Sequence, residues 1–227
     1  MSSNKKVILN ICVGKNDRSV VKCYLKGIRV EFMKEKILLS TLELACEKGL
    51  GYVSMSQIAA RCGLSKSSLY SHYKSKEEII HKMYEYFRNK AFNQNRNVDI
   101  SNFNKNSSFI DVLSTIISSY KSMNSEPDLA MFYKMIYAER TLNKEAARVL
   151  VLETNRMIEA TKRLFTYTNE LGISHIVDID AVAMSFALNV NQIMNYEFDL
   201  SFIGENHKSY LDLYIKEFAR VYGGNSL

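Results

Sequence analysis

The chain has 227 residues and a formal net charge of +6, and hydrophobic residues make up 47% of it. That length suits one large or two small domains with a sizeable core. With one Pro and nine Gly, and with apolar residues recurring every three or four positions, the chain should be all-α, because strand-rich folds of this size need more turn residues. No apolar run reaches the roughly 18 residues of a membrane span, so we expect a soluble, cytoplasmic protein.

The positive charge is concentrated toward the N-terminus. Residues 1–30 hold seven Lys or Arg and one acidic residue, residues 31–90 hold ten and seven, and residues 91–227 hold thirteen and sixteen. The N-terminal part is therefore expected to face an anionic partner. Charge alone fits a nucleic acid and a membrane surface equally well, so a motif has to decide between them.

Residues 1–32 form a basic extension ahead of the first clear helical pattern. The short apolar run at 7–13 is interrupted by polar residues and lacks a cleavage site, which argues against a signal peptide. Two interpretations stay open: a basic arm that contacts nucleic-acid phosphates, or an optional extension, since translation can begin at Met33. The first helix is expected from Lys34 to Lys48, and Gly49 should stop it.

The stretch from Ser54 to Lys76 combines two helix starts with a tight turn. Ser54 and Gln57 have the spacing of a capping box, which predicts that a helix begins there. Gly63 tolerates the left-handed conformation that ends such a helix, and Ser65 can cap a second, short one. This order of elements predicts a helix-turn-helix, whereas the alternative is a plain helical hairpin with a polar face.

The second helix of this motif has an apolar side and a polar side. Leu69 and Tyr73 are expected to point inward, which leaves the polar side to a groove of DNA. A second capping box is expected at Ser75 and Glu78. The segment also carries positive charge without any acidic residue between positions 61 and 76, as a polyphosphate partner requires. Its basic residues are Arg61, Lys66, Lys74 and Lys76.

This stretch resembles the DNA-binding signature of the TetR family of bacterial transcriptional regulators. The matching residues are Gly49, IA at 58–59, GLS at 63–65 and LYSHYKSKEEI at 69–79. The resemblance is close only from about Ile37 to Phe87. It implies an all-α homodimer with a three-helix DNA-binding domain at 33–91 and an effector-binding and dimerisation domain at 92–227. Where the family usually has Leu-Phe, this chain has Leu44 and Ala45, and either Leu50 or Tyr52 has to fill the missing volume.

The resemblance also implies which residues contact DNA. The positions that resemble phosphate contacts are Ser54, Tyr70 and Lys76. The positions that resemble groove contacts are Lys66, Ser67, Ser68 and His72. Lys66 is the best candidate for reading a base, because a lysine can donate to O6 and N7 of guanine.

Beyond the motif, apolar spacing predicts six further helices, for roughly nine in all. They are expected at Lys76 to about Asn93, Phe109–Met123, Pro127 to about Arg140, Lys144–Leu171, Asp178 to about Asp199, and Lys208–Tyr222. Asn143 and Asp178 are the expected caps of two of them. The polar run at 93–108 is interpreted as a connection, which places the domain boundary near Ala91.

The resemblance implies an effector pocket and a dimer interface in the second domain. The pocket candidates are Tyr84, Phe87, Phe109, Tyr133, Tyr137, Arg140 and Phe165. The alternative is that these aromatic residues are core, and Arg140 would need an anionic partner if it turned inward. The interface candidates, on the last two helices, are Phe186, Val190, Ile193, Leu211, Tyr214 and Phe218.

No motif for catalysis, a cofactor or a metal is present. The four Cys residues form no CxxC pair, and the four His residues are not clustered with other titratable groups. Cys46 and Cys62 should be packed, with redox sensing as the alternative.

The sequence thus predicts a homodimeric DNA-binding transcriptional regulator. It would be a repressor released from a near-palindromic operator by an apolar or amphipathic small molecule. A regulator whose motif docks protein, and a helical ligand-binding enzyme, are the two alternatives from other classes.

Overall fold

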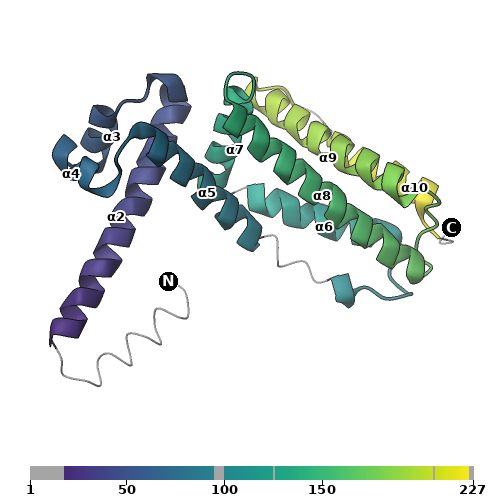
Figure 1. The fold of residues 1–227 in the computed structure, drawn as a ribbon. Coiled ribbons are helices and arrows are strands. Elements are labelled where there is room, and N and C mark those ends of the chain that lie inside the picture. The colour runs from purple at the N-terminus through teal and green to yellow at the C-terminus, as the bar shows by residue number, and fades with distance from the viewer. Residues whose placement is uncertain (1–17, 95–99, 125, 207, 225–227) are drawn as a thin grey trace. The chain divides into compact units, whose positions relative to one another are not determined.

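The computed structural model describes residues 18–94, 100–124, 126–206 and 208–224 (Figure 1). These residues fold into α-helices, two short 3-10 helices and one isolated antiparallel bridge between Ser174 and Gly223, which confirms the all-α prediction. The chain divides into two compact units between Tyr86 and Phe87, inside helix α5. No helix of the described residues is long and apolar enough to cross a membrane.

The first unit contains α2 (Arg18–Lys48), η1 (Leu50–Tyr52), α3 (Met55–Cys62), α4 (Lys66–His72) and the first part of α5 (Lys76–Gln94). Helix α2 begins well before the predicted start at Lys34. The reason is that the segment 18–33 has no Pro, and its one Gly, Gly27, costs a helix only about 1 kcal/mol. Residues 1–17 of the predicted extension lie outside the described residues, and with them Cys12.

The turn after α2 settles which side chain fills the core there. Gly49 adopts φ 86° and ends the helix as predicted. Leu50 is buried with 4% of its surface exposed, whereas Tyr52 is 80% exposed. Leu50 is therefore the residue that packs inside, where Leu44 and Ala45 are also buried, and Tyr52 faces solvent.

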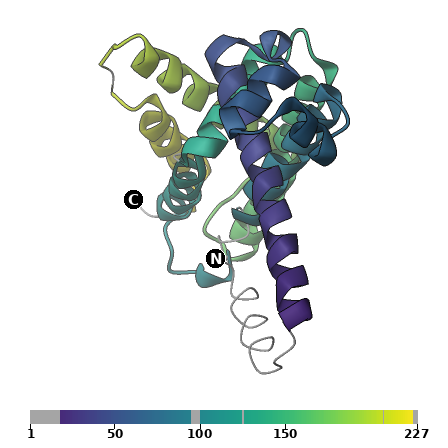
Figure 2. The same cartoon turned by 90° about the vertical axis from the view of Figure 1, so that its left-hand side faces the viewer.

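The second unit contains the end of α5, η3 (Ile100–Asn102), α6 (Phe109–Asn124), α7 (Pro127–Glu139), α8 (Lys144–Glu170), α9 (Ile179–Phe202) and α10 (Tyr210–Tyr222). Helices α8 and α9 pack along each other, and α10 packs on α6 and α9 (Figures 1 and 2). The core lies between them and is rich in aromatic rings. The ring centres of Phe186 and Phe218 are 4.6 Å apart, and the ring of Phe165 stacks on that of Phe218 with 5.6 Å between the centres.

Local capping signals fix most helix starts of this unit. The side chain of Asn143 accepts hydrogen bonds from the N–H groups of Glu145 and Ala146, and Asp178 accepts one from Ala181, which confirms both predicted caps. Helix α10 begins later than predicted because Ser209 caps it, with its hydroxyl accepting from the N–H of Asp212. Capping side chains of this kind accept hydrogen bonds from N–H groups that have no partner inside the helix.

Candidate nucleic-acid interface and cavity

Helices α3 and α4 form the predicted helix-turn-helix. The N–H of Ser54 donates to Oε1 of Gln57 (3.0 Å), and the N–H of Gln57 donates to Oγ of Ser54 (3.4 Å), which completes the capping box. Gly63 ends α3 in the left-handed conformation, with φ 71° and ψ 30°. The N–H of Leu64 then bonds to the carbonyl of Ala59 at 2.8 Å. These contacts hold the second helix at a fixed angle to the first.

Helix α4 has one side buried in the core and a polar side exposed to solvent. Oγ of Ser65 accepts from the N–H of Ser68 at 3.1 Å and caps the helix. Leu69 is fully buried and Tyr73 is 5% exposed, so this side of α4 is anchored in the core as predicted. The exposed side chains are Lys66, Ser67, Ser68 and Tyr70, while His72 is half-buried.

The start of α5 is joined to the loop before α3. Lys76 is half-buried as a residue, and its ammonium donates to the carbonyl oxygen of Gly51 at 3.2 Å. Oγ of Ser75 accepts from the N–H of Glu78, but the carboxylate of Glu78 accepts from the N–H of Lys74 instead of that of Ser75. Only half of the second capping box is therefore present, and Lys76 supports the loop next to Ser54.

The charges of the motif are not all available to a partner. The guanidinium of Arg61 binds both oxygens of Glu47 at 2.9 and 2.7 Å, and Glu43 at 3.3 Å. This hydrogen bond also lowers the pKa of the Glu47 carboxyl. The ammonium groups of Lys66 and Lys74 are exposed and form no ion pair with the residues that the structure describes. They carry the free positive charge, whereas the sequence count had included Arg61.

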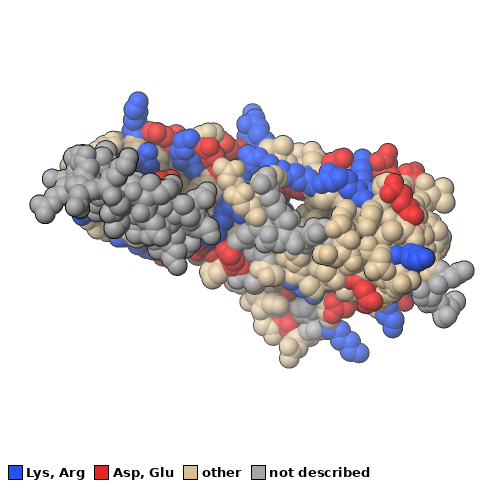
Figure 3. All heavy atoms as spheres, turned by 90° about the horizontal axis from the view of Figure 1, so that it is seen from below, with Lys and Arg blue, Asp and Glu red and all other residues tan. Residues whose placement is uncertain are grey.

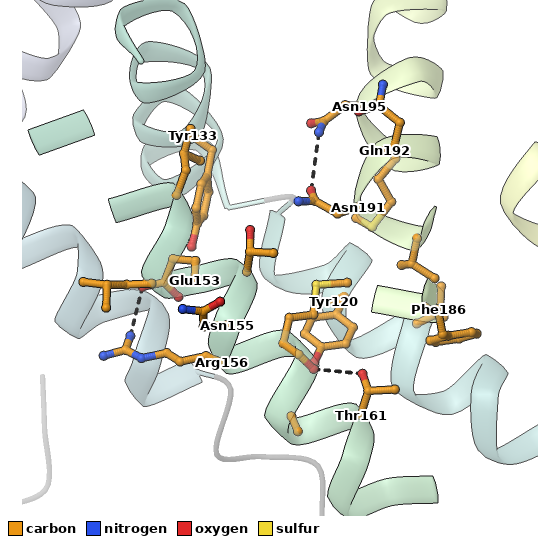
Figure 4. Close-up of a pocket in the computed structure, with 18 of the residues that line it drawn as sticks. Tyr120, Tyr133, Glu153, Asn155, Arg156, Thr161, Phe186, Asn191, Gln192 and Asn195 are labelled. Carbon is orange, nitrogen blue, oxygen red and sulfur yellow. Dashed lines mark hydrogen bonds and ion pairs between the residues drawn. The ribbon is translucent and has the colours of Figure 1, made fainter. Parts of the chain in front are cut away.

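A cavity of about 1170 Å³ opens in the second unit, between α6, α7, α8 and α9 (Figure 4). Of the predicted pocket residues, Tyr133, Tyr137 and Arg140 line it. Phe109 and Phe165 lie in the core cluster, Phe87 stacks on Phe132 at 5.2 Å, and Tyr84 is buried in the first unit. For these four residues the core interpretation holds in place of the pocket interpretation.

The lining also includes polar residues that the sequence analysis missed. One group lies on α9, where Oδ1 of Asn191 accepts from the hydroxyl of Tyr137 (3.0 Å) and from Nδ2 of Asn195 (3.4 Å). Gln192 lies beside them (Figure 4). Asn191 and Asn195 are one helical turn apart on α9, and this spacing could have indicated a polar cavity wall.

A second polar group lies where α8 lines the cavity with Glu153, Asn155 and Arg156, a surface named here the α8 wall. Glu153 accepts a hydrogen bond from the guanidinium of Arg156 at 2.9 Å, and Nε of Arg88 is 3.8 Å from its carboxylate. Burial raises the pKa of Glu153, and the two arginines oppose that shift. Burial also raises the pKa of Tyr133, whose ring stands beside this group (Figure 4).

Arg140 does not turn inward to bind an anion. It follows the last residue of α7, its side chain is exposed, and its guanidinium donates to the carbonyl of Tyr137 at 2.8 Å. The same guanidinium lies 5.2 Å from the centre of the Tyr137 ring. Its charge is thus used at the end of its own helix, at the rim of the cavity.

The predicted interface residues lie mostly inside one chain. Val190 and Leu211 are fully buried, and Phe186 and Phe218 are at most 9% exposed. Ile193 and Tyr214 are half-buried against the same cluster. These side chains stabilise the core of the second unit and leave little of their own surface to a contact between copies. Exposed apolar side chains on these two helices are Met184, Leu188, Tyr196, Phe198, Phe202, Tyr210, Leu213 and Val221.

Known proteins share both the motif and the fold. Residues 37–83 match the sequence model of the bacterial regulatory proteins of the tetR family. Over 66 residues, or 29% of this chain, the sequence is 33% identical to the HTH-type transcriptional regulator YerO of Bacillus subtilis (strain 168), and the match spans 23% of YerO.

Two solved structures extend the similarity to both units. A TetR-family transcriptional regulator from Mesorhizobium loti MAFF303099 matches with a TM-score of 0.62 and 18% identity, over 86% of this chain and 98% of that one. AibR, in complex with isovaleryl coenzyme A and operator DNA, matches with a TM-score of 0.51 and 18% identity, over 70% and 83% of the two chains. At these identities the structures establish the fold alone.

The capping box of Ser54, the turn at Gly63 and the exposed lysines define a helix-turn-helix motif, and this motif is similar to the one in HTH-type transcriptional regulators. More specifically, residues 37–83 are similar to the bacterial regulatory proteins of the tetR family, as the signature at 58–79 had indicated.

Proposed function

We propose that the chain binds operator DNA as a homodimer and represses transcription until an effector enters the cavity of the second unit. The observation that carries the DNA-binding part is the polar, exposed face of α4, held on the buried Leu69 and flanked by unpaired lysines. A short helix presented in this way fits the major groove. The proposed domains are residues 33–91 for DNA and residues 92–227 for dimerisation and effector binding.

The geometry supports distinct roles along the motif. Lys66, Ser67, Ser68 and His72 are the proposed groove contacts, and Lys66 is the proposed base reader because its ammonium is exposed and unpaired. Ser54, Tyr70 and Lys76 are the proposed phosphate contacts. Lys76 would act at the loop that it already joins to α5 through the carbonyl of Gly51.

Dimerisation is proposed through the exposed apolar side of α9 and α10. Met184 and Leu188 are one helical turn apart on α9, and 48% and 45% of their surfaces are exposed. Leu213 on α10 is 59% exposed. Single exposed apolar residues are common, but several on two adjacent helices favour an interface. Two copies would place two motifs on successive major-groove faces, roughly 34–36 Å apart, on a near-palindromic site.

Release is proposed to act through α5, which begins at the motif and whose residue Phe92 lines the cavity. An effector that binds the DNA-incompetent arrangement more tightly would weaken DNA binding, and a typical coupling of about 1–3 kcal/mol corresponds to roughly 5- to 150-fold. AibR, whose structure holds both a small molecule and operator DNA, supports this reading of the second unit. Linkage requires operator DNA to weaken effector binding by the same factor.

The test is selection of bound sequences from a pool of random duplexes, followed by mobility-shift titration of the selected site. We expect a near-palindrome, with log K falling by about 0.9 per phosphate contacted for each unit of log salt. Recovery of no sequence, or an affinity that salt leaves unchanged, would refute the proposal and favour a motif that docks protein.

A further inference from the structure

The α8 wall of the cavity has more positive charge than its carboxylate can neutralise. Glu153 faces two guanidinium groups, those of Arg156 and Arg88, and accepts its hydrogen bond from Arg156. Nε of Arg88 is buried and has no hydrogen-bond partner among the described residues. One carboxylate between two arginines leaves about one uncompensated positive charge, and a buried donor without a partner is costly.

Other charges at the cavity do not change this balance. Among the acidic lining residues, Glu159 is paired with Lys162 at 3.3 Å, and Asp199 belongs to α9 and not to the α8 wall. Lys134 and Arg163 add further positive charge to the lining. Figure 3 shows a band of Lys and Arg side chains beside a hollow in the second unit. A cation would have to displace Arg156 from Glu153, so the site disfavours it.

The rest of the wall can complete an anion site with an apolar floor. Arg156 lines the cavity with a half-exposed side chain and lies 5.3 Å from the ring of Phe92. Asn155 and the hydroxyl of Tyr133 lie near it and have no hydrogen-bond partner among the described residues (Figure 4). The remaining lining is largely apolar and includes Ile117, Leu164 and Phe186. Ligand cavities commonly combine such a floor with a few polar groups that orient the ligand.

From this arrangement we propose that the effector is an amphipathic anion, whose carboxylate binds the guanidinium of Arg156 and whose apolar body packs between α6, α8 and α9. The proposal rests on the effector-dependent function proposed above, which it makes specific. Arginine recognises a carboxylate through two parallel N–H donors, which gives the head group a fixed orientation.

The same binding event reaches α5. When the carboxylate of the ligand binds the guanidinium of Arg156, the carboxylate of Glu153 loses its hydrogen-bond partner. Nε of Arg88 lies 3.8 Å from that carboxylate. A closure of about 1 Å would bring the two groups to hydrogen-bond distance. Arg88 belongs to α5, so Arg88 acts as a positioning residue that couples head-group binding to this helix.

Calorimetric titration with matched ligands tests the charge of the effector. One series is decanoate, decanol and decylamine, and the other is naphthylacetate, naphthylethanol and naphthylethylamine. In at least one series the carboxylate should bind about 10- to 150-fold more tightly than the alcohol, the factor expected for a hydrogen bond to a charged group. Equal or tighter binding of the alcohol or amine in both series, or no binding in either, would overturn the proposal.

Two variants of α8 locate the site. Arg156→Gln should weaken the carboxylate to the level of the alcohol and leave the alcohol unchanged. Arg148→Gln, an exposed residue of the same helix that does not line the cavity, should change neither affinity. An equal loss for carboxylate and alcohol in Arg156→Gln would mean a structural effect and would count against the proposal.

Hydrogen exchange tests the coupling. The carboxylate ligand should slow amide exchange in α5 of the unaltered chain, whereas Arg88→Gln should still bind the ligand without this change. Persistence of the slowing in Arg88→Gln would refute the relay. Neither measurement contains DNA, so failure of operator binding would affect only the proposed function, and failure here would affect only the nature of the ligand.

Discussion

Gly63→Ala tests the turn on which the helix-turn-helix depends. Gly63 sits at φ 71°, and a Cβ built there meets no atom within 4 Å. A steric clash therefore contributes nothing, and the left-handed backbone alone should cost about 1–2 kcal/mol. Because local opening exposes the amides of α3 and α4, their hydrogen exchange should become about 5- to 30-fold faster.

Two further substitutions make this test specific. Gly63→Asn should cost less, since Asn tolerates the left-handed region. Gly27→Ala also meets no atom within 4 Å but lies inside α2, so Ala should stabilise that helix by up to about 1 kcal/mol. The reasoning would be refuted by wild-type exchange in Gly63→Ala, or by Gly63→Asn exchanging as fast as Gly63→Ala.

Three other outcomes follow from the structure. In titrations with a set of mutated operators, Lys66→Ala should relax base preference, whereas Lys76→Ala should weaken all sequences alike, and unchanged preference in both would contradict the assignment of Lys66. Phe186→Ala should lower stability by about 3–5 kcal/mol in urea unfolding, whereas Leu188→Glu should give monomers in sedimentation with stability nearly intact, and a dimeric Leu188→Glu would move the interface elsewhere. Burial, and then Glu78, raise the pKa of the Tyr73 hydroxyl to about 12. The stability that the neutral hydroxyl contributes is therefore full below about pH 10 and is lost as the pH rises through 12. In alkaline unfolding, this loss of stability should be absent from Tyr73→Phe.

The sequence alone was sufficient for the features that depend on neighbouring residues. The capping box of Ser54, the left-handed turn at Gly63 and the caps at Asn143 and Asp178 all lie where the pattern predicted them. Each uses a hydrogen bond or a dihedral angle within about four positions of the chain, so its cause is visible in a short window. The start of α2 was missed because no cap signal and no breaker marks it.

The tertiary structure alone decided which side chains are free to act. Arg61 counts as a free charge in the sequence, but Glu43 and Glu47 of α2 neutralise it. Phe186 was predicted at the interface and Phe165 in the pocket, yet their rings meet in the core. Glu153 and Arg156 line the cavity instead. Helical periodicity shows that a face is apolar or polar, but only the packing of distant helices determines whether that face meets a core, a cavity or solvent.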